Sequence, residues 1–186
     1  MRKISVFNFL TLNGFYKGLN EDISWHKHGG GENEYAEEGA QSESILLFGR
    51  KTYEMMASYW PTPMALEQNK KVAEGMNRSE KIVFSTTLQK AAWANTRIIS
   101  QNSMEEVAAL KNTPGKDMTI LGSGSLVTQL TDASLIDEYQ FMIDPVALGE
   151  GSSVLQNINR KLDLELVSHK VFPSGVVLLI YRTIRK

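Results

Sequence analysis

The fold class of this chain is indicated most clearly by residues 118–126, which read Met118-Thr119-Ile120-Leu121-Gly122-Ser123-Gly124-Ser125-Leu126. The first four of these residues form a short apolar run, which is typical of a buried strand. From Leu126 onward, Val127 and Leu130 follow the spacing of one helix face. Glycine and serine separate the two patterns, so the chain passes from strand to helix within a few residues. Such strand-to-helix units predict an α/β domain with a largely parallel sheet.

The same alternation recurs toward the N-terminus. Residues 44–49 are apolar on both faces, as expected of a strand that helices cover on both sides. Helical spacing follows, and Thr62-Pro63 predicts the start of a second helix whose buried side includes Val72 and Met76. Three more short apolar runs predict further strands, at residues 4–10, 81–85 and 97–100.

The C-terminal third has a different pattern. Residues 139–143 and 162–166 alternate between apolar and polar side chains, as exposed or half-buried strands do. Pro173-Ser174-Gly175 then predicts a turn into a last apolar strand at residues 176–181. We therefore expect the sheet to be mixed and to end in an antiparallel hairpin.

Composition limits the classes of protein to which the chain can belong. Its 186 residues fit a single domain over residues 1–186. Twenty basic and 21 acidic residues leave a net charge of −1, which predicts no nucleic-acid partner and no anionic membrane partner. The absence of cysteine excludes thiolate chemistry and fits a reducing, cytoplasmic location. Asn8 and Thr11 interrupt the N-terminal apolar stretch, unlike a signal peptide.

Two strand-to-helix junctions are candidate ligand sites, because ligands of open α/β sheets bind outside the carboxyl ends of strands. At the first, Gly122 and Gly124 would let a pyrophosphate approach the backbone, and Ser123 and Ser125 would add hydroxyl donors. A plain turn that binds no ligand explains these four residues equally well.

The second junction reads Gly49-Arg50-Lys51-Thr52. Two cations at a helix start oppose the helix dipole, so their position favours a bound anion. The alternative is two solvated charges, each with a small cost to the helix. Two phosphate-compatible junctions suit a dinucleotide, and the basic pair suits an extra 2′-phosphate, hence NADP rather than NAD.

Five segments together resemble the dihydrofolate reductase superfamily, and most closely its branch related to the C-terminal reductase domain of the riboflavin-biosynthesis deaminase-reductase. They are Leu12-Asn13-Gly14-Phe15, residues 49–54, Gly122-Ser123-Gly124, Asp137-Glu138-Tyr139 and residues 145–151. The resemblance runs from about residue 2 to 184. It implies a dihydrofolate reductase-like three-layer α/β/α domain with a mostly parallel central sheet, and a homodimer.

The resemblance also implies the cofactor NADPH and the residues that bind it. These would be Gly49, Arg50, Lys51, Thr52, Gly122, Ser123, Gly124, Ser125 and Leu126, with Ser85 and Thr86 at the adenosine end. The implied activity is reduction of a small heterocyclic or ribosylamino substrate, as in 5-amino-6-(5-phosphoribosylamino)uracil reductase. A dihydrofolate or pterin reductase is the alternative, and a nucleotide-binding protein without turnover is the alternative from another class.

Fewer residues point to the substrate. The position at which folate reductases place a catalytic carboxylate falls at Asn33 or Glu34, and Glu34 would serve if buried, although glutamates also favour a helix start. Asn13 replaces the aspartate usual in its turn, and Trp25 and Trp60 are candidates to stack on a flat heterocycle, with core packing the alternative for Trp60. His26 and His28 have no third ligand nearby in the sequence, so we expect no metal site.

Overall fold

The computed structural model describes residues 1–26 and 29–184. Eight strands form the main sheet: β1 (Ile4–Thr11), β3 (Ile45–Gly49), β4 (Lys81–Phe84), β5 (Thr96–Ile99), β6 (Met118–Leu121), β7 (Glu138–Asp144), β9 (Leu164–Val171) and β10 (Val177–Thr183). Two short strands, β2 (Phe15–Lys17) and β8 (Ser152–Ser153), pair separately. The helices are α1 (Gly30–Gln41), α2 (Arg50–Tyr59), α3 (Pro63–Gln68), α4 (Lys70–Arg78), α5 (Ser103–Asn112) and α6 (Gly124–Asp132), with a 3₁₀ turn at Leu19–Glu21.

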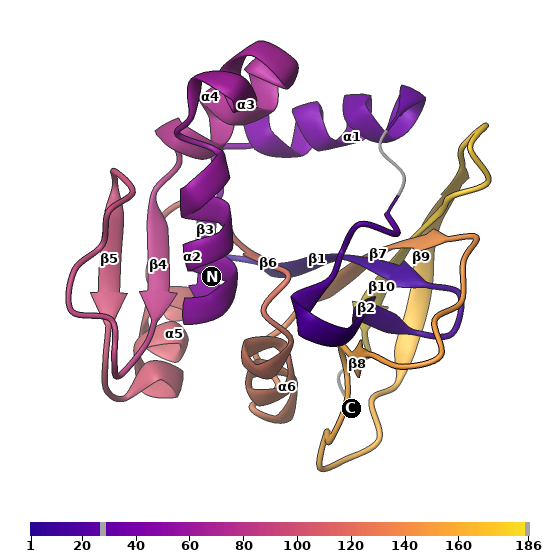
Figure 1. Ribbon diagram of the computed structural model, residues 1–186. Helices are drawn as coiled ribbons and strands as arrows, with labels where there is room; N and C mark the ends of the chain where they lie inside the picture. The colour runs from indigo at the N-terminus through magenta and orange to yellow at the C-terminus, as the bar shows by residue number, and fades with distance from the viewer. Residues whose placement is uncertain (27–28, 185–186) are drawn as a thin grey trace.

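The main sheet has the order β5-β4-β3-β6-β1-β7-β10-β9 (Figure 1). Its strands from β5 to β7 pair in parallel, and β10 runs antiparallel to both β7 and β9. The turn between β9 and β10 contains Gly175 at a φ of +90°, a conformation that glycine adopts without strain. The predicted mixed sheet and its C-terminal hairpin are confirmed.

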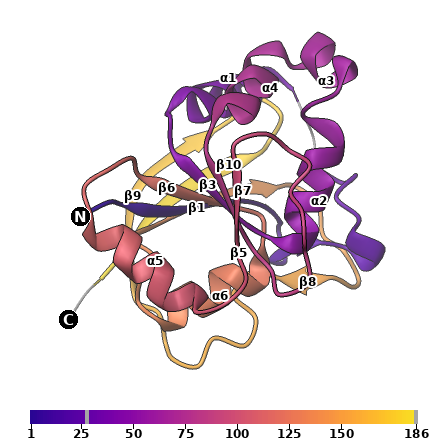
Figure 2. The same cartoon turned by 90° about the vertical axis from the view of Figure 1, so that its left-hand side faces the viewer.

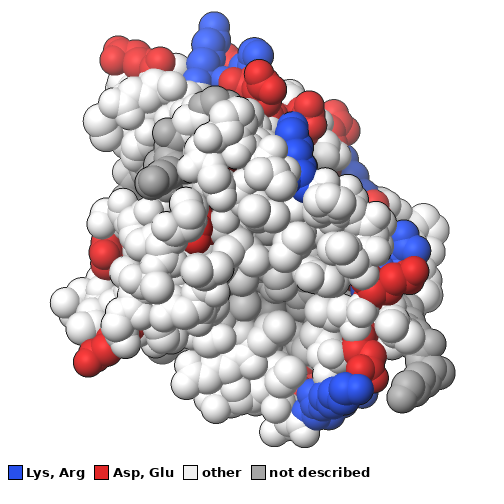
Figure 3. Space-filling view, turned by 90° about the vertical axis from the view of Figure 1, so that its right-hand side faces the viewer, with Lys and Arg blue, Asp and Glu red and all other residues white. Residues whose placement is uncertain are grey.

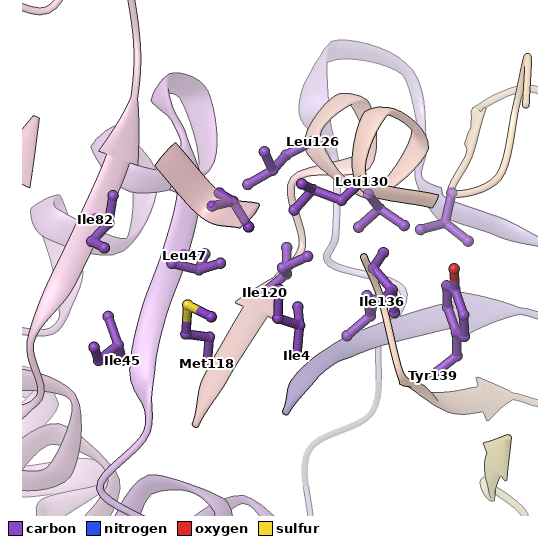
Figure 4. Close-up of a cluster of buried hydrophobic side chains, with 14 of the residues drawn as sticks. Ile4, Ile45, Leu47, Ile82, Met118, Ile120, Leu126, Leu130, Ile136 and Tyr139 are labelled. Atoms are coloured by element: carbon purple, nitrogen blue, oxygen red, sulfur yellow. The ribbon is translucent and has the colours of Figure 1, made fainter. Parts of the chain in front are cut away.

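Helices cover the sheet on both faces, which gives three layers (Figure 2). On one face, Leu47 joins Ile82, Ile120 and residues of α6 in a buried cluster (Figure 4). On the opposite face, its neighbour Phe48 packs with residues of α2 and α4. Strand β3 is therefore buried on both sides, as the apolar run at residues 44–49 predicts.

The segment after α2 differs from the prediction of one helix. Thr62 caps α3 as expected, because its side chain accepts a hydrogen bond from the Ala65 amide at 3.2 Å. The helix then stops at Asn69, whose φ of −139° is not helical, and α4 begins at Lys70. Val72 and Met76 lie on α4, where Met76 is buried. The single predicted helix is thus two helices with a break at Asn69.

Among the described residues, no helix combines the length and the hydropathy that crossing a membrane requires.

Candidate functional site

The two predicted junctions lie side by side, because β3 and β6 are neighbours in the sheet. The Gly49 amide donates a hydrogen bond to the Ser123 hydroxyl oxygen at 3.0 Å, and that hydroxyl donates to the Leu121 carbonyl at 3.0 Å. The Ser123 amide in turn donates to the Thr52 hydroxyl oxygen at 3.2 Å. The side chains of Ser123 and Thr52 thus tie the two junctions into one unit.

The glycine loop is shaped by close packing. Gly122 and Ser123 both adopt left-handed conformations, with φ values of +57° and +53°. A Cβ atom on Gly122 would lie 3.1 Å from the methyl group of Thr52, and one on Gly124 would lie 2.7 Å from the ring of Tyr16. The close packing therefore favours glycine at both positions, in addition to any ligand they admit.

Helices α2 and α6 start at these junctions without a side-chain cap among the described residues. Gly49 and Ser123 occupy the N-cap positions: Gly49 has no side chain, and the Ser123 side chain accepts no hydrogen bond from a first-turn amide of α6. First-turn amides point out of a helix and carry partial positive charge. Two neighbouring helix starts of this kind favour a bound anion.

A cleft of about 290 Å³ opens beside them, at the carboxyl ends of β3, β4 and β5. In Figure 1 these ends point down toward α5 and α6. The cleft is lined by residues of five helices and strands and of two loops: Gly49, Arg50, Phe84, Ser85, Thr86, Thr87, Ser100, Ser103, Ser125, Leu126 and Gln129. A second hollow of about 430 Å³ continues from it and shares Thr86 and Ser100. Among the residues that the structure describes, those of the lining are rich in hydroxyl groups and include no carboxylate.

The cleft brings together part of the predicted cofactor site. Six of the predicted residues line it: Gly49, Arg50, Ser85, Thr86, Ser125 and Leu126. Ser85 also shapes its wall, because its hydroxyl oxygen accepts hydrogen bonds from the Leu88 amide at 2.9 Å and the Thr87 amide at 3.2 Å. Lys51, Thr52, Gly122, Ser123 and Gly124 lie outside the lining.

Arg50 is the basic residue of the cleft within the described part of the chain. Its guanidinium contacts Glu54 one turn further along α2 at 2.9 Å, in an exposed pair that contributes little to stability. Lys51 instead contacts Glu21 at 3.0 Å. Hydrogen bonds from Lys17 and Lys51 lower the pKa of Glu21. The two cations of the sequence motif therefore have different surroundings, and Arg50 alone faces the cleft.

Five residues of the lining were not predicted from the sequence: Phe84, Thr87, Ser100, Ser103 and Gln129. Ser100 directly follows β5, and Ser103 is the first residue of α5. They form a third strand-to-helix junction on the same edge of the sheet. Like the other two junctions, it lies at the carboxyl end of a strand, where ligands of open α/β sheets bind. The absence of glycine there concealed it.

Two of the predicted substrate residues hold other parts of the chain together. The Asn13 side-chain amide donates to the Leu148 carbonyl at 2.7 Å, and its oxygen accepts from the Thr11 hydroxyl at 2.8 Å. The bond to Leu148 joins the turn after β1 to the loop after β7, and the bond from Thr11 holds the turn itself. Trp60 packs against the buried cluster that contains Phe48. Core packing was the alternative that the sequence offered for this residue.

The predicted acid Glu34 is exposed on α1, so the burial that its catalytic role requires is not met. Glu32 is the buried glutamate of this helix, and it accepts a hydrogen bond from the Ser174 hydroxyl. Trp25 is partly buried, and its indole N–H donates to the Asp22 carbonyl at 3.2 Å. None of the three side chains lines the cleft.

A buried pair near Trp25 was not predicted. His26 Nδ1 lies 2.8 Å from Asp144 Oδ2, and the His26 ring stacks on Phe9 with ring centres 3.5 Å apart. Both side chains are almost fully buried. His28 lies outside the described residues, and the described part of the chain contains no group of three or more residues suited to bind a metal.

Comparisons with known proteins agree with this architecture. The family model of the RibD C-terminal domain matches residues 2–178. YyaP, an uncharacterized protein of Bacillus subtilis strain 168, is 31% identical over 182 residues, which cover 97% of this chain and 94% of YyaP.

A protein from Shewanella sp. PV-4 named for riboflavin biosynthesis superposes with a TM-score of 0.74 at 17% identity, covering 98% of this chain and 99% of that one. Dihydrofolate reductase from Enterococcus faecalis, solved with NADP(H), gives a TM-score of 0.68 at 16% identity, covering 98% and 97% of the chains. The dihydrofolate reductase-like fold expected from the sequence is confirmed.

Proposed function

The chain belongs to the RibD C-terminal domain family, and from this premise we propose that it is a reductase that uses NADPH. Its substrate is a small heterocyclic or ribosylamino compound, with 5-amino-6-(5-phosphoribosylamino)uracil as the leading candidate. The observation that carries the proposal is the cleft beside α2 and α6, where hydroxyl groups and Arg50 meet two uncapped helix starts.

The residues of the cleft fit a phosphorylated cofactor. Hydroxyl and guanidinium groups bind phosphate, and a carboxylate in the lining would repel it. Ser125 and the first amides of α6 would bind the pyrophosphate, and Ser85 and Thr86 the adenosine end. Arg50 would pair with the 2′-phosphate, which NADPH has and NADH lacks.

The bound cofactor would supply a hydride to a C=N or C=O bond, while the chain binds and orients both reactants. The reacting end of the cofactor would lie toward β6 and β1, because its adenosine end is assigned to β4 on the other side of β3. We assign no side chain as the proton donor. The predicted homodimer and the cytoplasmic location stay predictions.

Two other candidates rest on specific observations. A dihydrofolate or pterin reductase is supported by the fold shared with the Enterococcus faecalis enzyme. A nucleotide-binding protein without turnover is supported by α1, where Glu34 is exposed and Glu32 is engaged by Ser174. Neither glutamate is thus a buried, free acid of the kind that a folate reductase places on this helix.

Oxidation of NADPH in the presence of candidate substrates separates these functions. The purified protein would be incubated with the ribosylaminouracil, dihydrofolate and dihydrobiopterin, and the loss of NADPH absorbance recorded. We expect turnover with the ribosylaminouracil. Turnover with a pterin alone would favour the second candidate, and binding of NADPH without any turnover would favour the third.

A further inference from the structure

Asn8 is a buried polar residue without a partner. It is 3% exposed, and within the described residues neither its side-chain nitrogen nor its oxygen forms a hydrogen bond. Its surroundings are apolar, with Val6 and Leu10 on the same face of β1 and Phe141 directly opposite on β7. Buried amides are nearly always hydrogen-bonded, so an unpaired one calls for an explanation.

The position of Asn8 places it beside the candidate site. The preceding residue, Phe7, pairs with Leu121 at the end of β6, and the Gly122 amide donates to the Phe7 carbonyl at 3.3 Å. Asn8 is therefore level with Gly122, where the chain leaves the sheet to form α6. Strand alternation puts its side chain on the same face as Ile4, which α6 covers (Figure 4). The free amide thus lies on the α6 side of the glycine turn.

The chemistry of the amide restricts what binds it. A primary amide offers donors and an acceptor next to each other, so it is satisfied by a group that also carries both, such as another carboxamide. A phosphate would satisfy only the donor half. Adenine also carries both, but the adenosine end is assigned to β4, three strand spacings or about 14 Å from β1. In the proposed orientation the nicotinamide end lies toward β6 and β1, the strands that carry the glycine turn and Asn8.

We propose that the Asn8 side chain hydrogen-bonds the carboxamide of the nicotinamide ring and so positions that ring beside the glycine turn. This inference rests on the proposed function, because it requires that the chain bind NADPH. It adds a recognition residue that lies outside the cleft lining and outside the sequence motifs. Among the described residues, the amide has no hydrogen-bond partner that such a ligand would have to displace.

The test compares NADPH with its 3-acetylpyridine analogue, in which a methyl group replaces the carboxamide NH₂. Calorimetric titration of the wild type is expected to show at least ten-fold weaker binding of the analogue. In Asn8→Leu, the two cofactors should bind within two-fold of each other, because the group that distinguishes them is gone. Asn112→Leu, an exposed asparagine at the end of α5, should discriminate like the wild type.

Stability without cofactor provides a second measurement. Asn8→Leu removes an unpaired buried amide, so its Tm is expected to rise, and Asn8→Val serves the same purpose if leucine does not fit. Undiminished discrimination by the variant would overturn the proposal, and a lower Tm with undiminished discrimination would make Asn8 a structural residue. A folded wild type that binds no NADPH would contradict the proposed function itself, and the role of Asn8 with it.

Discussion

Lys81, at the start of β4, is a buried charged residue whose desolvation is offset by hydrogen bonds to backbone carbonyl oxygens. It is 1% exposed, and its ammonium group donates to the carbonyl oxygens of Ser79, Asn77 and Ala94 at 2.6, 3.2 and 3.2 Å. The same group lies 4.4 Å from the centre of the Trp93 ring. Burial lowers the pKa of Lys81 to about 8, because a charged ammonium is poorly solvated there.

This pKa shift predicts a rise in stability at alkaline pH. In the unfolded chain, Lys81 has the ordinary pKa of 10.5, whereas in the folded chain its pKa is about 8. Between these values the unfolded chain binds more protons, so the free energy of unfolding rises with pH, by up to about 3 kcal/mol. Urea unfolding at several pH values should show the rise in the wild type and lose this component in Lys81→Met.

The exposed Lys70 of α4 provides the control, since Lys70→Met should keep the alkaline rise. A wild-type curve that runs parallel to that of Lys81→Met from pH 7.5 to 10.5 would contradict the assignment.

Gly124 carries a second prediction at the residue scale. Because a Cβ atom there would lie 2.7 Å from the Tyr16 ring, Gly124→Ala is expected to lower the free energy of unfolding by about 1–3 kcal/mol. Gly39 lies in α1 with open space around it, so Gly39→Ala should raise stability by about 0.5–1 kcal/mol. Equal effects of the two changes in denaturant unfolding would rule out the close packing as the cause.

Arg50 provides the residue-level prediction for the cofactor. Removing a charge-assisted hydrogen bond costs about 1.5–3 kcal/mol, so Arg50→Ala should weaken NADPH binding by about ten- to a hundred-fold. NADH binding should change little, because NADH lacks the 2′-phosphate. Arg78→Ala on α4, away from the cleft lining, is the matched control. Equal losses for NADPH and NADH would place Arg50 at the pyrophosphate instead.

At the scale of elements, hydrophobic patterning predicted the sheet well and the helices less well. The apolar run at residues 44–49 has one explanation in a layered fold, a strand covered on both faces, and β3 matches it. The break at Asn69 could not be predicted from the sequence, because the spacing of Val72 and Met76 fits one long helix as well as two short ones. Burial of Glu32 rather than Glu34 depends on the turn after β9, which brings Ser174 to α1 from far along the chain.

Strand β9 is the element that best accommodates the predicted homodimer. It forms one edge of the main sheet, and Leu166, Val167 and Val171 on it are 49%, 43% and 66% exposed. On the side of the molecule that includes β9 and β10, charged side chains lie mainly around the rim and leave the centre uncharged (Figure 3). An exposed apolar edge of this kind favours association with another chain.

Replacing Leu166 and Val171 together with lysine should therefore convert a dimer into a monomer. Both side chains are exposed, so the free energy of unfolding per chain should change by no more than about 1 kcal/mol. Sedimentation equilibrium measures the mass directly. A wild type that is monomeric would contradict the predicted homodimer, and a double variant that remains dimeric would exclude β9 as its surface.

At the scale of the whole molecule, the sequence predicted two strand-to-helix junctions, and the structure brings them together beside one cleft. Glycine and serine at the strand ends could be assigned to the same edge of the sheet, because a parallel topology places the carboxyl ends of its strands together. The sequence did not indicate that the Ser123 amide donates a hydrogen bond to Thr52 or that Lys51 forms an ion pair with Glu21. Such contacts join residues that are distant in the sequence, and a local pattern contains no information about them.

Calorimetric titration of the wild-type protein with NADPH and NADH measures whether this cleft binds NADPH. We predict micromolar binding of NADPH, with NADH at least ten-fold weaker, a difference of about 1.4 kcal/mol. Equal affinity for the two would remove the role of the 2′-phosphate. The absence of binding of either to the folded protein would contradict the account, and the glycine junctions would then be turns that serve only the fold.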